Sequence, residues 1–248
     1  FGFKISGEEA KGLRALSRKA GATMYMTLLS IYGILLSKLS NQEDMVIGTP
    51  NSGRMHADLE GMLGMFVNTL PLRLEVLGSL QYDEFLLKLK TRVLSSFDHQ
   101  GYQYEELIDA LQLARDTSRN PLFDVMFTYD HENSSTAMEL SGLELSPYER
   151  SCTVAKFDLT LAVLDNEDQL DLILTYSTSL FSSVTISRFA NYFSRSVSEV
   201  VKNSGVMLSE IDVMPQVERE ELLTVFNATE VVYPLNQTVV SLFEEQVG

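Results

Sequence analysis

Apolar residues recur every three to four positions along several stretches of the chain, and this spacing predicts amphipathic helices. The first helix is bounded by a capping box, Ser6 with Glu9, and by Gly21, a residue typical of helix ends. Thr23 is placed to cap a second, more apolar helix that ends near Asn41. Further helices are predicted over residues 85–97, 104–112 and 184–203.

Short apolar runs bounded by turn residues predict β-strands between these helices. They cover residues 1–5, 44–50, 65–76 and 121–130. The clearest local pattern lies at 156–177, where two apolar runs flank the polar turn 166–168 and predict an antiparallel hairpin. Helices and strands in this order predict an α/β fold of the α+β kind, in which a mixed sheet is flanked by helices.

The pattern of core positions ends near residue 208. From Ser209 onward, short helical and extended pieces alternate, and a new element begins at "LFEEQV", residues 242–247. We therefore predict one lobe over residues 1–208, followed over 209–248 by a linker and the start of a further domain.

Composition narrows the classes of function. The net charge of −15 argues against nucleic acid and against an anionic membrane as partners, because no basic surface is available to neutralise phosphates. The most apolar run, residues 22–39, is interrupted by polar residues and falls short of the ~20 apolar residues that span a bilayer. The start of the chain does not have the pattern of a signal peptide. The single cysteine, Cys152, excludes an internal disulfide, and we expect a cytoplasmic protein.

Residue types that could perform chemistry are sparse. The three histidines, His56, His99 and His131, lie too far apart in sequence for a local metal site, so we expect none. Cys152 has no diagnostic surroundings and is interpreted as a strand thiol. The glycines of "EGMLGMF" do not form a phosphate-binding loop. The acids Asp165, Glu167 and Asp168 lack the spacing of a calcium loop and predict a solvated turn.

His56 is the sharpest catalytic candidate. As a general base it would need an orienting acid, which Asp58 or Glu60 could supply. Residues two apart on an extended chain point to opposite faces, so a structural loop is the favoured interpretation, although loop geometry could bring the two side chains together. The residues by themselves predict an α/β lobe and no particular reaction.

Several longer motifs resemble those of one family. "IGTPNSGRMHADLEGMLGMFVNTLPLR", residues 47–73, resembles a core motif of the condensation domains of nonribosomal peptide synthetases. "FDHQGYQYEELIDAL" is similar to the family's next motif, with Asp98 in place of the usual Asn and Gln103 where Pro is common. "RDTSRNPLFDVMFTY" resembles the third, and residues 218–247 resemble the connector into an adenylation domain.

The resemblance implies a lobe of a two-lobed relative of chloramphenicol acetyltransferase. The family's active histidine lies in an HHxxxDG motif on the first lobe, and this sequence contains no HH pair. Residues 1–208 thus resemble the C-terminal lobe of a condensation domain, and residues 209–248 resemble the linker and the start of the adenylation domain. It follows that His56 is not the family's catalytic histidine, and we expect the chain to be inactive on its own.

The resemblance also assigns places to particular residues. A loop around residues 51–64 would form the floor of the tunnel between the lobes, with Arg54, His56, Asp58 and Asn68 as the residues that shape it. Five residues match motif positions, and for each the favoured role is structural, in which side chains near strand ends tie loops to backbone: Arg54, Asn68, Arg119, Asn120 and Asp158. A segment within residues 139–158 is predicted to cross to the first lobe.

The implied reaction is peptide bond formation between two tethered thioesters. Upstream and downstream peptidyl carrier proteins would present them on 4′-phosphopantetheine arms, so the chain itself would bind no cofactor, and much of catalysis would be positioning. The other implied partners are the N-terminal lobe and the adenylation domain. Two alternatives stay open: a platform that docks carriers without chemistry, and a lobe of an epimerisation or cyclisation relative. An isolated lobe would expose apolar surface, so self-association is expected.

Overall fold

The structure is a computed structural model that describes all residues except 114–115, 117–118, 132–153, 167, 232–236 and 248. The chain divides into two compact units, residues 1–213 and 214–248. The first unit therefore continues five residues beyond the predicted limit at Leu208. The reason is that Leu208 and Ile211 are both 2% exposed and that the Ser209 N–H donates to the Gly78 carbonyl.

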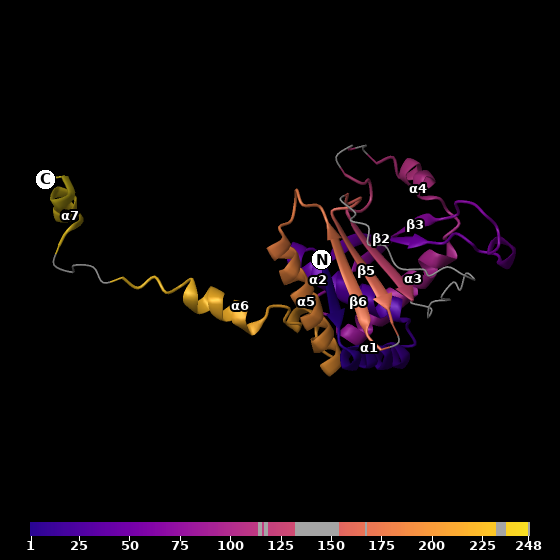
Figure 1. Cartoon of the computed structure of the whole chain (residues 1–248), viewed down its shortest axis with the longest axis horizontal. Coiled ribbons are helices and arrows are strands. Elements are labelled where there is room, and N and C mark those ends of the chain that lie inside the picture. Colours follow the sequence, from indigo (N-terminus) through magenta and orange to yellow (C-terminus); the bar gives the residue numbers. More distant parts are fainter. Residues whose placement is uncertain (114–115, 117–118, 132–153, 167, 232–236, 248) are drawn as a thin grey trace, which may run out of the picture. The chain divides into compact units, whose positions relative to one another are not determined.

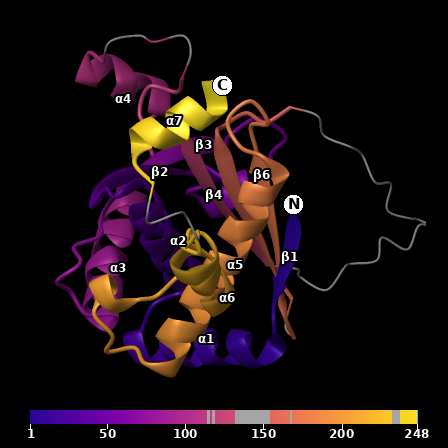
Figure 2. The same cartoon turned by 90° about the vertical axis from the view of Figure 1, so that its left-hand side faces the viewer.

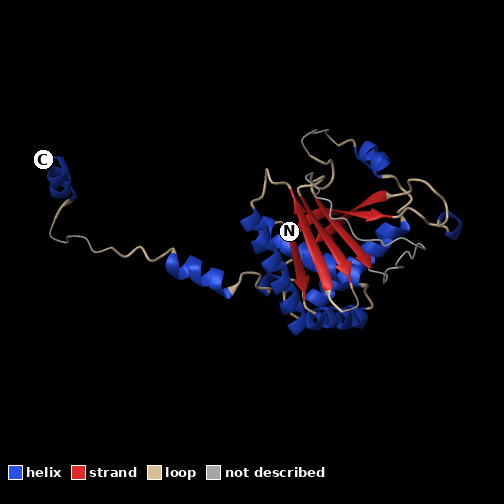
Figure 3. Cartoon of the chain, viewed as in Figure 1, coloured by secondary structure: helices blue, strands red, loops and turns tan. Residues whose placement is uncertain are grey.

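The first unit contains a six-stranded sheet flanked by helices, which confirms the predicted fold class (Figure 3). The strands are β1 Gly2–Ile5, β2 Asp44–Asn51, β3 Asn68–Glu75, β4 Val125–His131, β5 Leu159–Asp165 and β6 Leu170–Tyr176. The helices are α1 Gly7–Ala20, α2 Met24–Ser40, α3 Tyr82–Asp98, α4 Tyr104–Leu111 and α5 Ser183–Lys202. Two single 3₁₀ turns cover Ala57–Leu59 and Leu208–Glu210.

The sheet has the order β1-β6-β5-β4-β2-β3. β4 pairs in parallel with both β2 and β5, whereas the other neighbours are antiparallel. The predicted hairpin is confirmed as β5–β6, with pairs from Leu159↔Tyr176 to Asp165↔Leu170. β2 and β4 share only the pair Gly48↔Met126, so these two strands separate on either side of it.

The predicted helix ends are confirmed in α1 and α2. The Ser6 hydroxyl accepts the Glu9 N–H and donates to its carboxylate, and Gly21 closes α1 at φ 58°. Thr23 caps α2 by accepting the Met26 N–H at 3.2 Å, and Asn41 ends it at φ 54°. These signals act within one turn of helix, which explains why they could be predicted locally.

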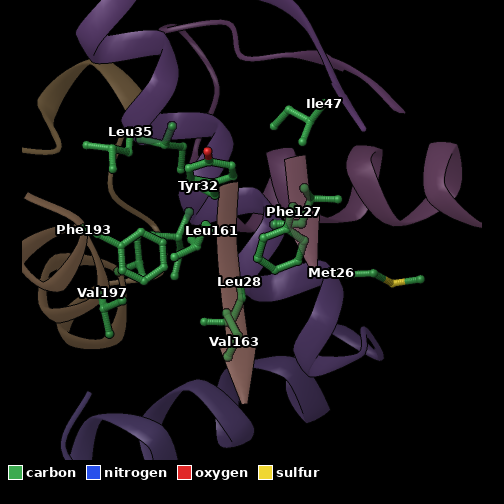
Figure 4. Packing of buried hydrophobic residues seen from close by; sticks show 14 of the residues in the cluster. Met26, Leu28, Tyr32, Leu35, Ile47, Phe127, Leu161, Val163, Phe193 and Val197 are labelled. Atoms are coloured by element: carbon green, nitrogen blue, oxygen red, sulfur yellow. The ribbon is translucent and has the colours of Figure 1, made fainter. Parts of the chain in front are cut away.

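Helices α1, α2, α3 and α5 cover one face of the sheet (Figures 1 and 2). α2 is the central helix, because its residues 26–35 are all buried. Figure 4 shows Leu28, Tyr32 and Leu35 of α2 gathered with Phe127 of β4 and Phe193 of α5. Among the described residues no single helix could span a membrane, and the apolar pair α1–α2 is bent by 105°.

Two strands begin later than predicted. β3 begins at Asn68 rather than at Met65, because its pairing with β2 ends at Asn51↔Asn68. β4 begins at Val125 rather than at Pro121. Just before it, the ring of Phe123 lies where a Cβ on residue 48 would be, so any larger residue at that position of β2 would have to displace the ring.

The prediction of a solvated turn is wrong for Asp165, which is 4% exposed at the end of β5. Arg14 of α1 pairs with its carboxylate at 2.5 Å, and the Tyr129 hydroxyl donates to the other oxygen at 2.6 Å. Asp168 is exposed as predicted, and Glu167 lies outside the described residues. The buried carboxylate is therefore compensated by an ion pair and a hydrogen bond.

The second unit, residues 214–248, contains short helices with exposed apolar side chains. α6, Gln216–Glu220, continues into a π-helical turn, Glu221–Val225, and α7 covers Val239–Val247. Val217, Leu223 and Phe226 are each more than 60% exposed. The assignment of this unit to a linker and the start of a further domain stays a prediction.

Candidate functional site

The β2–β3 loop, residues 52–67, carries most of the residues predicted to shape a tunnel, and it projects beyond the two strands that it connects (Figure 1). Its neck is closed by the pair Asn51↔Asn68 and by a close approach of Gly53 to Phe66. Gly53 has φ 66°, and a Cβ on it would overlap the Phe66 carbonyl. Glycine is thus required there on two counts.

Arg54 braces the β2–β3 loop from within. Its guanidinium donates to the Leu59 carbonyl and lies 4.6 Å from the centre of the Phe66 ring. A cation over an aromatic face contributes about 0.5–1 kcal/mol at a partly exposed position. Arg54 is therefore occupied with loop structure.

His56 and Asp58 do come together, because the loop turns at this point. His56 Nδ1 accepts the Asp58 N–H and lies 3.3 Å from the Asp58 carboxylate. His56 thereby caps the 3₁₀ turn Ala57–Leu59. The two side chains are 73% and 88% exposed, so they lie in solvent rather than in a cavity. In the described structure this pair therefore lies at a capped turn on the exposed loop.

Asn68 joins two of the sequence motifs. Its side chain is 4% exposed, and its Nδ2 donates to the carbonyls of Gln100 and Tyr102 at 3.0 and 2.9 Å. Its Oδ1 accepts the N–H groups of Thr69 and Tyr104 at 2.9 and 3.2 Å. This buried amide holds the 99–104 segment against the start of β3.

Gln100 is a residue that the sequence analysis missed. Its Oε1 accepts the Asn51 amide at 2.5 Å, so the 99–104 segment is tied to the end of β2 as well as to β3. The sequence alone contains no signal for this contact, because the partners lie 49 positions apart.

A cavity of about 440 Å³ opens between the carboxyl ends of β2 and β4, beside the β2–β3 loop. Tyr25, Thr49, Asn51, Thr128 and Asp130 provide polar groups on its wall. Burial raises the pKa of Tyr25 to about 12, with the nearby Thr49 hydroxyl acting in the opposite direction. This hydroxyl stays protonated at neutral pH, so it can form hydrogen bonds but cannot act as a base.

Arg119, Asn120 and Asp158 lie at the opposite ends of the parallel strands. Arg119 forms a two-contact ion pair with Asp124, which raises the pKa of the guanidinium. The Asp158 N–H donates to the Asp124 carbonyl, and the Asp158 carbonyl accepts the Ser177 N–H, both at 3.0 Å. Asn120 is half-buried beside them. These contacts fix the starts of β4 and β5.

A second cavity, of about 580 Å³, lies at this end of the sheet. Its walls are mostly apolar and include Leu36, Met45 and Phe123, with Arg119 and Asp124 also lining it. The two groups of predicted residues therefore do not form one site. Arg54, His56, Asp58 and Asn68 lie at one end of the sheet, and Arg119, Asn120 and Asp158 lie at the other.

Some predictions fall outside the described residues. Cys152 and most of the predicted crossing segment, residues 139–153, belong to this group. Within the part that is described, three or more His, Cys, Asp or Glu side chains nowhere gather in a way that could hold a metal ion.

A sequence model of the condensation domain matches residues 1–223 of the chain. The chain belongs to the condensation domain family. Gramicidin S synthase 2 of Brevibacillus brevis is 41% identical over 245 residues, which is 99% of this chain and 6% of the synthase. Tyrocidine synthase 3 of Brevibacillus parabrevis is 41% identical over 239 residues, covering 96% of this chain and 4% of that synthase. The chain thus spans a small part of these relatives.

Solved structures of the family share the fold. A holo four-domain nonribosomal peptide synthetase bound to AMP and glycine superposes with a TM-score of 0.77 at 25% identity, over 88% of this chain and 18% of that one. The X-domain from teicoplanin biosynthesis gives a TM-score of 0.80 at 24% identity, over 86% and 49% of the two chains. The family assigned from the motifs, and its chloramphenicol acetyltransferase-like fold, are confirmed.

Proposed function

We propose that residues 1–208 are the C-terminal lobe of a condensation domain and that residues 209–248 are its linker and the start of an adenylation domain. Together with an N-terminal lobe, this lobe would form peptide bonds in the cytoplasm between thioesters on two peptidyl carrier proteins. The observation that carries the proposal is the 41% identity to gramicidin S synthase 2 over 99% of the chain. The coverage of 49% of the teicoplanin X-domain chain is in keeping with a single lobe.

In the proposed reaction the amine of the downstream aminoacyl thioester attacks the carbonyl carbon of the upstream thioester. A C–N bond forms, the C–S bond breaks, and the upstream 4′-phosphopantetheine leaves as a thiol. None of this chain's histidines has the HHxxxDG pattern, so the reacting histidine would come from the N-terminal lobe.

This lobe would help to position the two tethered substrates and would not itself transfer protons. Asn68 and Gln100 hold the β2–β3 loop and the 99–104 segment together, and Arg54 stiffens the loop. A fixed wall of this kind favours the reaction by restricting how two tethered substrates meet. In the proposed domain this wall would be the floor of the tunnel.

The experiment compares this chain with the same chain extended upstream by a full lobe. Each is mixed with a donor acyl-carrier and an acceptor aminoacyl-carrier, and the dipeptidyl thioester is followed by mass spectrometry. We expect product from the extended protein only. It should be lost when the second histidine of its HHxxxDG is changed to Ala, and retained in the matched His131→Ala variant.

Other outcomes would point elsewhere. Product from neither protein, with carrier binding retained, would favour a docking platform without chemistry. An inverted stereocentre or a heterocycle in the product would favour an epimerisation or cyclisation relative. Product from this chain alone would contradict the assignment of the reacting histidine to the other lobe.

A further inference from the structure

The exposed methionines of the described structure gather in the β2–β3 loop. Met55, Met62 and Met65 are 63%, 50% and 88% exposed, whereas Met26 and Met126 in the core are 5% and 7% exposed. The remaining methionines of the described residues are half-buried. Leu63, at 102% exposed, completes an apolar loop tip.

The loop tip is carried on a neck that does not depend on these methionines. Gly53 and Phe66 close the neck, and Arg54 binds the Leu59 carbonyl and the Phe66 ring. Met62 and Met65 can therefore change chemically without loss of the contacts that shape the loop. Met55 is different, because its thioether lies beside the position that a Cβ on Gly101 of the 99–104 segment would take.

We propose that Met55, Met62 and Met65 form a reversible oxidation site for a peroxide such as hydrogen peroxide. The O–O bond of the peroxide breaks and an S–O bond forms, so that the thioether is oxidised to a sulfoxide and the peroxide is reduced to water. A sulfoxide is polar, and it changes an apolar surface into a polar one. Oxidation would thus switch the loop tip from apolar to polar while the neck stays in place.

The consequence for catalysis rests on the function proposed above. If the β2–β3 loop lines the path of the tethered substrates, sulfoxides at its tip would weaken contacts with apolar groups there. At Met55, the added oxygen would also crowd Gly101 and loosen the link to the 99–104 segment. Both effects lower the rate of peptide bond formation.

The first test needs no assumption about function. The chain is treated with graded hydrogen peroxide, quenched, digested and mapped by mass spectrometry. Because susceptibility follows exposure, we expect the three loop methionines to oxidise on the order of ten-fold faster than Met26 and Met126. Methionine sulfoxide reductases should return them to thioethers. Oxidation that begins at Met26 or Met126, or at equal rates, would overturn the proposal.

The second test asks whether oxidation of the loop methionines makes the surface of the chain more polar. Retention on a hydrophobic-interaction column should fall after peroxide treatment. In the triple variant Met55→Leu, Met62→Leu, Met65→Leu, which keeps an apolar tip of similar volume, retention should not change. An equal fall in the triple variant would overturn the assignment to this loop.

The third test uses the extended two-lobe protein, with each protein compared with its own untreated sample. Peroxide should lower dipeptidyl thioester formation in the parent more than in the triple variant. Equal losses, or protection of all three methionines from peroxide, would overturn the proposal for the assembled domain. Failure to form any product before peroxide would instead count against the proposed function, and the peptide map would still decide the oxidation site.

Discussion

Two buried tyrosines in the first unit differ in whether the hydroxyl group has a hydrogen-bond partner, and this difference can be tested. Tyr32 and Tyr82 are both fully buried. The Tyr82 hydroxyl lies 2.9 Å from the Ser30 hydroxyl, which itself donates to the Thr27 carbonyl at 2.6 Å. The Tyr32 hydroxyl has no hydrogen-bond partner among the described residues. The same substitution to Phe should therefore act in opposite directions at the two positions.

The magnitude follows from the cost of burying a hydroxyl. Without a partner, a buried hydroxyl costs roughly 1–3 kcal/mol of stability. Tyr32→Phe removes that cost and keeps the ring contact with Phe127, whose centroid lies 6.0 Å away. We expect Tyr32→Phe to raise the free energy of unfolding by about 1 kcal/mol. Tyr82→Phe loses a buried hydrogen bond and should lower it by about 1 kcal/mol.

Urea unfolding followed by far-UV circular dichroism measures both changes. With a slope of about 2–3 kcal/mol/M, each change moves the midpoint by roughly 0.3–0.5 M, in opposite directions and with the slope unchanged. A Tyr32→Phe variant that is destabilised as much as Tyr82→Phe would refute the reasoning. In that case the Tyr32 hydroxyl would have a partner such as a buried water.

Four further results are expected. Burial raises the pKa of Tyr25 to about 12, so the unfolded chain loses this proton at a lower pH than the folded chain does. The contribution of Tyr25, measured as the difference in urea midpoint between the parent and a Tyr25→Phe variant, should be constant between about pH 7 and 10 and should fall between about pH 10 and 12. Asn68→Ala removes a buried amide with four hydrogen bonds and should cost about 2–3 kcal/mol of stability by the same assay. Gly48→Ala drives a Cβ into the Phe123 ring and should cost about 1–3 kcal/mol, and Phe123→Leu in the same chain should recover part of it. Light scattering after size-exclusion chromatography should show concentration-dependent association of the chain; a monodisperse monomer at high concentration would count against an uncovered lobe face.

The parts of the fold that could be predicted are those fixed by neighbours in sequence. The caps at Ser6 and Thr23 act over three residues, and the β5–β6 hairpin is closed by a turn of a few residues. The parallel pairing of β4 with β2 and β5 joins strands that are separated by long connections, and no local pattern encodes it. A role for Asn68 in tying a loop to backbone was predicted, but its partners in the 99–104 segment, and the contact of Gln100 with Asn51, could not be foreseen for the same reason.

Asp165 shows where a more consistent use of the pattern would have succeeded. Leu159, Leu161 and Val163 are buried at alternate positions of β5, and Asp165 continues that alternation. A strand with a period of two places all four side chains on the core face. The residue type of Asp165 suggested a solvated turn, but its position in the strand indicated burial. The ion pair with Arg14 and the hydrogen bond from Tyr129 compensate for burying its carboxylate.

The motif residues also show that family motifs need not share one site. Asn68 and Arg119 both lie in stretches that resemble motifs of the condensation domain, yet the strand pairing places them at opposite ends of the sheet. Asn68 organises the end that carries the β2–β3 loop, and Arg119 with Asp124 fixes the start of β4. Loss of Arg119 should therefore loosen the start of β4, whereas loss of Asn68 should lower stability and release the 99–104 segment from the start of β3.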